Sequence, residues 1–313
     1  MSLKDELNYY GSRLEPILFV INFDMSKWYI HKLKDLPKNI KYSINKTTKN
    51  TKPITLSRKF IDFATYKNMI KNIKKRIKNG DIYLLNLTFS TDITTNATLE
   101  HIYDNANAKF KLLYKNKFVS FSPERFIRID KNKIYTYPMK GTIDKNIPKA
   151  KEKIINDTKE KAEHIMTVDL LRNDLSIVAK NVTVEKLRYI DEIKTDNKTL
   201  LQVSSKISGE LKKDWQKSLG DIITSLLPAG SITGTPKKKA VEIIKKIELH
   251  DRDFFTGIFG VFDGKSVDSA VLIRFIENQN GSLVYKSGGG ITYLSEIQSE
   301  YSEMKDKVYV PIF

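Results

Sequence analysis

The chain has 313 residues, of which 40% are hydrophobic, and its formal net charge is +17. This composition supports a large hydrophobic core and excludes a disordered chain, and no apolar run reaches the eighteen residues of a membrane span. The sequence contains no cysteine, which excludes disulfides, thiolate metal sites and a thiol nucleophile. The start, MSLKDELNYY, lacks the apolar segment of a signal peptide. We therefore expect a cytoplasmic protein without a membrane partner.

The positive charge comes mostly from lysines spread along the whole chain, as in KNIKKRIKNG. Such lysines usually form a solvated surface, and arginine, the better reader of phosphate and guanine, is scarce. The same charge attracts small anions, including a dicarboxylate. We favour a small anionic substrate and expect no nucleic acid, but a basic nucleic-acid-binding protein is retained as an alternative.

In the first third of the chain, strand and helix patterns alternate. PILFVINFD predicts a buried strand, and the polar segment 31–53 predicts a loop. Apolar spacing over 62–79 predicts a helix that ends at Asn79-Gly80. DIYLLNLTFSTDI then alternates as a strand does.

The remainder is richer in strands. FKLLYKN, KFVSFSPERFIRID and KIYTYPMKG predict a run of antiparallel strands, and 150–171 predicts a charged helix that stops near 172–174. VAKNVTVEKLRYI predicts a strand, and the turn GSITGTP precedes a helix, KKKAVEIIKKIEL. Three strands (TGIFGVFDG, SAVLIRFIE and GSLVYKSGGG) and a helix from about Ser295 complete the chain. Because strands mostly neighbour strands, we predict an α+β fold in one unit.

Two helical segments place carboxylates where they could bind a metal. Glu300 and Glu303 are three residues apart and share a helix face, with Lys307 four residues further on. Glu163, in AEHIMTVDLL, lies at the edge of an apolar stripe. Oxygen ligands of this kind suit Mg²⁺ better than Zn²⁺. The alternative for each is an ordinary charged helix surface.

Two glycine-rich segments and a pair of charged residues could complete a site. PAGSITGTPK and KSGGGIT, read as turns, would expose N–H groups to a carboxylate or phosphate, and neither has the spacing of a P-loop or a dinucleotide site. Glu124, in SPERF, and Lys140, in PMKGT, lie on strands that we expect to pair. They could act as a proton donor and a nucleophile, provided that the lysine is neutral.

These segments, in this order, resemble the chorismate-utilising enzymes. The resemblance runs from about Asn79 to Lys307 and rests on GDIYLLNLT, SPERF, PMKGT, AEHIMTVDLLRNDLSIVA, PAGSITGTPKKKAVEII, SGGGI and EYSEMKDK. It implies one catalytic domain, 1–313, of antiparallel sheets packed as a sandwich with helices outside. Within it, 1–60 would be a shortened N-terminal part and 61–313 the motif-bearing core.

The residue at position 140 indicates the branch of the family. Pro-x-Lys-Gly-Thr is similar to aminodeoxychorismate (para-aminobenzoate) synthase component I, whereas the anthranilate, isochorismate and salicylate branches resemble one another in having alanine there. The resemblance implies that Lys140 attacks C2 of chorismate as the C4 hydroxyl departs, and that Glu124 exchanges the protons. The product would be 4-amino-4-deoxychorismate, for folate synthesis. Anthranilate synthase component I is the alternative.

The resemblance also implies the ligand contacts. Glu163 and Glu303 would ligate Mg²⁺, with Glu300 close by, and Arg274 would bind the enolpyruvyl carboxylate. The N–H groups of the triple glycine would support the ring carboxylate. The complete set of implied substrate contacts is Gly141, Thr142, Thr233, Gly234, Arg274, Gly288, Gly289, Gly290 and Lys307.

Three positions depart from the family pattern. Phe255 replaces a frequent tyrosine, Leu84 replaces a glutamine or lysine, and Gln202 replaces a histidine associated with the anthranilate branch. The leucine argues against water as the nucleophile, and the glutamine fits the lysine branch. Phe255 and Leu84 also leave open a paralogue that binds chorismate without converting it.

The resemblance implies two protein partners. A chain without cysteine cannot contain a cysteine-dependent glutaminase, so glutamine-dependent activity would need a separate amidotransferase subunit. Converting the product to para-aminobenzoate would need an aminodeoxychorismate lyase. No serine-bearing segment of the type that binds tryptophan is found, so we expect no feedback inhibition by tryptophan.

Overall fold

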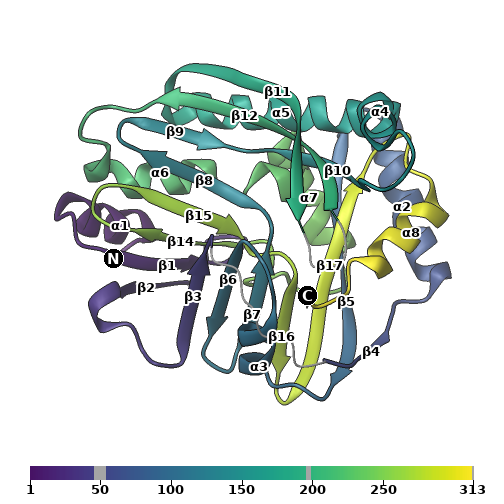
Figure 1. Cartoon of the computed structure of the whole chain (residues 1–313), viewed down its shortest axis with the longest axis horizontal. Coiled ribbons are helices and arrows are strands. Elements are labelled where there is room, and N and C mark those ends of the chain that lie inside the picture. Colours follow the sequence, from purple (N-terminus) through teal and green to yellow (C-terminus); the bar gives the residue numbers. More distant parts are fainter. Residues whose placement is uncertain (46–53, 195–198, 312–313) are drawn as a thin grey trace.

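The strands form two antiparallel sheets, seen in the computed structural model over residues 1–45, 54–194 and 199–311 (Figure 1). β11 (Lys180–Lys194) pairs with β12 of the first sheet. The order in the first sheet is β10 (Met139–Asp144), β12 (Thr199–Glu210), β9 (Lys133–Thr136), β8 (Arg125–Asp130), β15 (Val267–Val271), β14 (Ile258–Phe262), β1 (Ile17–Ile21) and β2 (Trp28–Lys32).

The second sheet contains the glycine-rich strand. β4 (Leu56–Lys59) pairs with β5 at one end of this sheet. The order is β13 (Gly234–Thr235), β5 (Leu84–Thr95), β17 (Ser282–Ile291), β16 (Phe275–Gln279), β7 (Phe118–Ser122), β6 (Phe110–Tyr114) and β3 (Ile40–Ile44). Two sheets with helices packed around them confirm the predicted α+β fold.

The helices begin and end at the signals that the sequence provides. Asp62 caps α2, accepting a hydrogen bond from the Thr65 N–H group at 2.9 Å, and Gly80, with φ of +79°, follows its end. The helices are α1 (Leu3–Ser12), α2 (Phe63–Lys78), α3 (Leu99–Asn105), α4 (Ala150–Asn156), α5 (Thr158–Val178), α6 (Leu219–Leu226), α7 (Lys237–Ile247) and α8 (Ile297–Asp306), with 3₁₀ turns η1 (Leu33–Asp35), η2 (Trp215–Ser218) and η3 (Gly230–Ile232). No helix of the described ranges is long and apolar enough to cross a membrane.

β1 shows how the two layers are joined. All five of its residues are buried, as the run ILFVI predicted. Leu18 and Val20 belong to a core cluster that includes Phe110 and Phe118 of the second sheet. The alternate residues of β1 face a different cluster, which contains side chains of α1 and α6. One face of the strand therefore packs on the other sheet and the opposite face on helices, as in the predicted sandwich.

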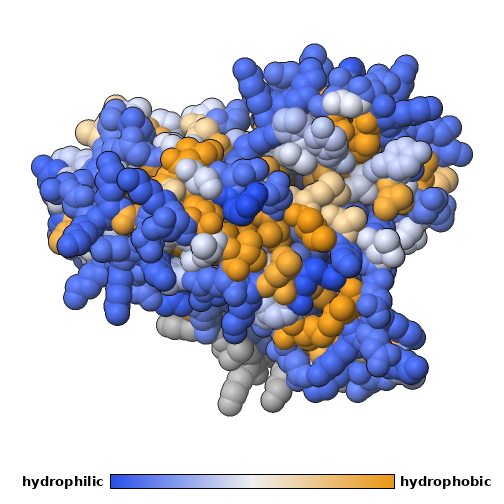
Figure 2. Space-filling model, turned by 90° about the horizontal axis from the view of Figure 1, so that it is seen from above, coloured by the Kyte–Doolittle hydropathy of each residue, from blue (hydrophilic) through white to orange (hydrophobic). Residues whose placement is uncertain are grey.

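The charged surface is solvated. In the view from above, hydrophilic residues cover most of the face and apolar residues gather in its middle (Figure 2). This distribution agrees with the prediction that the scattered lysines form a solvated surface.

Two predicted boundaries were wrong. The segment 31–53 is not a loop throughout, because β2 reaches Lys32 and β3 pairs with β6; its residues 46–53 lie outside the described ranges. The predicted helix of 150–171 is two helices, and α5 continues to Val178. It passes Asp174 because that carboxylate is buried and paired with Lys237 at 2.8 Å, so the polar residue does not end the helix.

Three strand predictions need correction. SAVLIRFIE forms β15 in one sheet and β16 in the other, because the chain crosses between the sheets near Arg274, whose φ is +52°. KSGGGIT is not a turn but the end of β17, paired with β5. Glu124 and Lys140 do not lie on paired strands, since β12 and β9 lie between β10 and β8.

Candidate active site

A cavity of about 490 Å³ lies where β10, α5, α8 and the end of β17 meet. Its volume is typical of sites for small molecules. Carboxylates, ammonium groups and backbone amides form much of its lining. Among the predicted site residues, the cavity is lined by Glu124, Lys140, Gly141, Thr142, Glu163, Arg274, Gly288, Gly289, Gly290, Glu300, Glu303 and Lys307.

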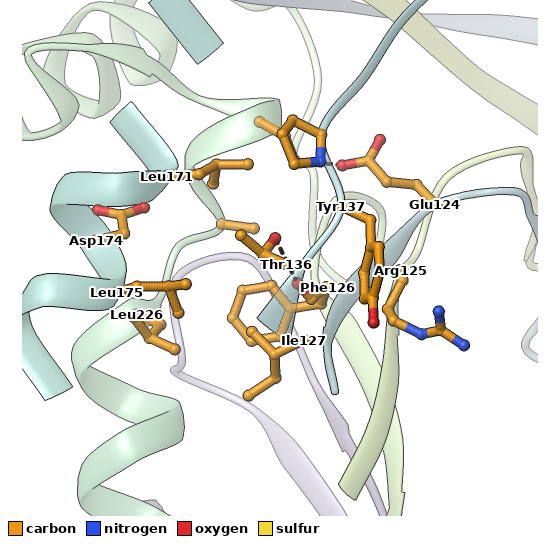
Figure 3. A pocket seen from close by; sticks show the side chains of 13 residues that line it. Glu124, Arg125, Phe126, Ile127, Thr136, Tyr137, Leu171, Asp174, Leu175 and Leu226 are labelled. Atoms are coloured by element: carbon orange, nitrogen blue, oxygen red, sulfur yellow. Dashed lines mark hydrogen bonds between the residues drawn. The ribbon is translucent and has the colours of Figure 1, made fainter. Parts of the chain in front are cut away.

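Glu124 is placed on the cavity wall by the entry into β8. Burial raises the pKa of its carboxyl group above the usual range, against the opposing effects of the hydrogen bond from Ser231 and the charges of Lys140 and Arg274. Glu124 also lines a small, mainly apolar pocket, where the neighbouring Arg125 points away from it (Figure 3). Glu124 therefore keeps its proton to higher pH than an exposed glutamate, which suits a general acid.

Lys140 lies inside the cavity and not on the outer surface. Its Nζ is 3.3 Å from Glu163 Oε2, and its side chain is 24% exposed. A Cβ atom built on Gly290 would lie 3.4 Å from the same Nζ, so the glycine leaves room beside the amine. The nucleophile that the sequence indicates is thus directed at the triple glycine.

The three predicted metal ligands come from two helices, and each is paired with a lysine. Glu300 Oε1 is 2.7 Å from the Nζ of Lys159, and Glu303 Oε1 is 2.7 Å from that of Lys307. Glu163 contacts Lys140 and lies 3.9 Å from Lys159. Alternating charges thus line this side of the cavity.

These pairs shift several pKa values. Burial would raise the pKa of Glu303, but the ammonium groups of Lys307 and Lys159 lower it overall. Burial lowers the pKa of Lys307, and Glu303 only partly offsets this effect. Burial also disfavours the charged form of Lys159, yet its hydrogen bond to Glu300 and the nearby carboxylates raise its pKa.

The donor chemistry suits magnesium. Mg²⁺ prefers carboxylate oxygens, and Glu163 Oε1 is buried without a hydrogen-bond partner. In the described ranges no three acidic, histidine or cysteine side chains are arranged as a ready metal cluster. A metal at Glu163, Glu300 and Glu303 would therefore have to replace contacts that lysines make.

The triple glycine forms a strand edge open to the cavity. β16 pairs with β17 only as far as Lys286, so the next residues have β5 on one side alone. Lys307 donates a hydrogen bond to the Gly288 carbonyl at 3.0 Å, which shows that this carbonyl points away from β5. Because donors alternate along an antiparallel strand, the N–H groups of Gly288 and Gly290 share this free edge, whereas that of Gly289 faces β5. The prediction that all three glycine N–H groups support a carboxylate is therefore corrected to two.

Arg274 is an unsatisfied cation in the cavity wall. Its Nε is buried without a hydrogen-bond partner, and its Cζ lies 5.3 Å from the centre of the Tyr309 ring. A buried guanidinium donor without a partner is costly unless a ligand satisfies it. A bound carboxylate would do so, as predicted from the sequence.

Two predicted contacts do not reach the cavity. Thr233 is fully buried and its hydroxyl donates to the carbonyls of Ala229 and Gly230. Gly234, in β13, pairs with Leu85 of β5, and a Cβ atom built on this glycine would lie 2.2 Å from the Leu84 carbonyl oxygen. Thr233 and Gly234 therefore support the cavity wall from behind and do not line the cavity.

The three residues that depart from the family pattern lie in different places. Leu84 is buried in the core and does not line the cavity. Phe255 and Gln202 do, and the Gln202 amide donates to the Thr142 hydroxyl at 3.4 Å.

Sequence reasoning missed several lining residues. Lys159 is four residues before Glu163, so helical spacing could have placed it on the same face. Ser231 lies in the PAGSITGTPK segment, but its contact with Glu124, 107 residues away in the chain, gave no signal. Glu160 and the buried Lys286 also line the cavity, and burial raises the pKa of Glu160, as does the nearby Glu163.

The cavity of this antiparallel sandwich combines ammonium groups, a guanidinium group and glutamates, a lining that suits a small anion. Residues 22–312 match the family of chorismate binding enzymes, and the chain belongs to that family. The membership confirms the resemblance seen in the sequence and favours an enzyme over the nucleic-acid-binding alternative.

Relatives within the family carry different names. The chain is 44% identical to an uncharacterised PabA-like protein of Pasteurella multocida, over 98% of this chain and 97% of the relative. It is 30% identical to aminodeoxychorismate synthase component 1 of Salmonella typhimurium, over 78% of this chain and 56% of that protein. The structure of anthranilate synthase component I from Streptococcus pneumoniae superposes with a TM-score of 0.68 at 23% identity, covering 82% of this chain and 59% of that one.

Proposed function

We propose that this chain is the chorismate-aminating component of an aminodeoxychorismate synthase, converting chorismate and ammonia to 4-amino-4-deoxychorismate. The observation that carries the proposal is Lys140, an amine inside the cavity beside Gly290. The resemblance implies alanine at this position in the branches that make other products. The relative named aminodeoxychorismate synthase component 1 supports the same assignment.

The cavity offers two separate anion sites for a dicarboxylate. Arg274 has an unsatisfied buried donor, and would hold the enolpyruvyl carboxylate. The free edge of the triple glycine, next to Lys307, would receive the ring carboxylate. When bound to Glu163 and Glu303, with Glu300 nearby, Mg²⁺ would supply further positive charge for the ring carboxylate.

The reaction is an exchange of a hydroxyl for an amino group. The neutral amine of Lys140 forms a bond to C2 while the C4–O bond breaks, and Glu124 gives its proton so that water leaves. Ammonia then bonds to C4, the bond between C2 and the lysine nitrogen breaks, and Glu124 accepts a proton from the new amine. The lysine and the glutamic acid are thereby regenerated.

Ammonia must be supplied by another protein or by the solution. The sequence contains no cysteine, so a glutamine-dependent reaction would use a separate amidotransferase subunit, and free ammonia should replace that subunit in vitro. A lyase would then convert the product to para-aminobenzoate.

A product assay tests the proposal. The chain is incubated with chorismate, Mg²⁺ and ammonium, and products are separated with and without added aminodeoxychorismate lyase. We expect para-aminobenzoate only when the lyase is present. Anthranilate formed without the lyase would refute the proposal in favour of anthranilate synthase.

A matched pair of variants tests the role of the amine. Lys140→Ala should lose amination, whereas Lys145→Ala, which removes an exposed lysine of the neighbouring turn, should keep it. Full activity of Lys140→Ala with ammonia would show that another group is the nucleophile.

A further inference from the structure

Lys159 lies between two carboxylates that belong to different helices. It stands in the first turn of α5, and its Nζ is 2.7 Å from Glu300 Oε1 on α8. The same Nζ is 3.9 Å from Glu163 Oε1, one turn further along α5. A single ammonium group therefore joins the two helices that carry the expected metal ligands.

The two carboxylates need a cation at this place. Their side chains are 7% and 4% exposed for Glu163 and Glu300, and two buried negative charges are unfavourable without a counter-charge. Glu163 Oε1 has no hydrogen-bond partner, so the ammonium group of Lys159, 3.9 Å away, is the positive charge that compensates this oxygen.

The side chain of Lys159 can rotate into solvent, whereas the two glutamates are buried. Its side chain is 30% exposed, and a lysine has a long flexible stem with a strongly hydrated ammonium group. The nearby Lys140 and Lys307 contact other carboxylate oxygens, Glu163 Oε2 and Glu303 Oε1 respectively. Rotation of this one side chain toward solvent would open the space between Glu163 and Glu300.

We propose that Lys159 is the resident cation of this acidic cluster, and that a divalent metal ion enters by displacing its ammonium group into solvent. The inference rests on the metal part of the proposed function and is independent of which product forms. No covalent bond changes: one positive charge leaves the cluster and two arrive. The competition weakens metal binding by the free enzyme, and the negative charge of a bound dicarboxylate favours the exchange.

Metal binding by two charge-matched variants tests this proposal. Lys159→Met and Lys161→Met each remove one positive charge from α5, but Lys161 is exposed and outside the cavity. Free Mn²⁺ is followed by electron paramagnetic resonance during titration, without chorismate. We expect Lys159→Met to bind Mn²⁺ at least about tenfold more tightly than the unmodified chain, and Lys161→Met to change less than about twofold. Unchanged or weaker binding by Lys159→Met overturns the proposal.

A second measurement uses the unmodified protein and so does not depend on a variant that folds. Amine acylation of each lysine is quantified by mass spectrometry with and without Mg²⁺. Displacement predicts faster labelling of Lys159 when Mg²⁺ is added and unchanged labelling of Lys161. Slower or unchanged labelling of Lys159 contradicts the proposal.

The outcomes separate this inference from the proposed reaction. Anthranilate as the product would refute the proposed function and leave the exchange at Lys159 intact. Absence of Mn²⁺ binding in both the unmodified chain and Lys159→Met would refute the exchange and the metal site, and leave the chemistry of Lys140 to its own test.

Discussion

Removing the hydroxyl of Ser231 should shift the pH dependence of catalysis. The hydroxyl donates a hydrogen bond to Glu124 Oε1 and thereby favours the ionised carboxylate, although burial holds the pKa above its usual range. A hydrogen bond to a charged group contributes about 1.5–3 kcal/mol, and one pKa unit corresponds to about 1.4 kcal/mol. Ser231→Ala should therefore raise the pKa of Glu124 further.

The assay is the rate of chorismate consumption against pH at saturating ammonia and Mg²⁺. In the proposed reaction Glu124 must be protonated to release the hydroxyl. Activity should then fall as pH rises through its pKa, and this descending limb should move to higher pH in Ser231→Ala. Ser176→Ala removes an exposed hydroxyl that donates to the Arg172 carbonyl and should leave the profile unchanged. A descending limb that stays in place, or moves to lower pH, would refute the assignment of Glu124 as the acid.

Two further pairs of variants test the frame of the site. Arg252→Met leaves the buried Glu248 carboxylate without its 2.7 Å partner and should lower the free energy of unfolding, measured in urea, by about 3–5 kcal/mol. Arg172→Met, at an exposed ion pair, should lower it by less than about 0.5 kcal/mol. Equal losses in the two variants would contradict the role of burial. Gly290→Ala places a methyl group in ordinary contact with the Lys140 amine and should raise KM for chorismate at least about tenfold with little loss of stability. Gly288→Ala places one 2.3 Å from a strand carbonyl and should destabilise the fold by about 1–3 kcal/mol; the reverse ranking of the two glycine variants would show that the strand edge is misassigned.

Much of the fold was predictable because its signals are local. The apolar run of β1 and the capped helix α2 follow from neighbouring residues, and both formed where expected. The triple glycine was read as a turn because glycine is common in turns, yet it lies in β17 because β5 supplies its hydrogen-bond partners. Pairing of this kind depends on residues about two hundred positions away, which local patterns do not reveal.

The site was partly predictable for the same reason. Motif-bearing residues such as Lys140 and Arg274 line the cavity, where the sequence placed them. Thr233 belongs to an equally distinctive motif but is turned into the wall by its own hydrogen bonds. Ser231, two residues earlier, reaches Glu124 instead, and only the three-dimensional path of the loop decides which hydroxyl faces the cavity.

The most direct test of the central claim is mass spectrometry of the protein after incubation with chorismate and Mg²⁺ in the absence of ammonia. We expect an adduct of chorismate less one water on the peptide that contains Lys140, and its disappearance when ammonium is added. A protein that aminates chorismate but never carries this adduct, or carries it on another residue, would contradict the account.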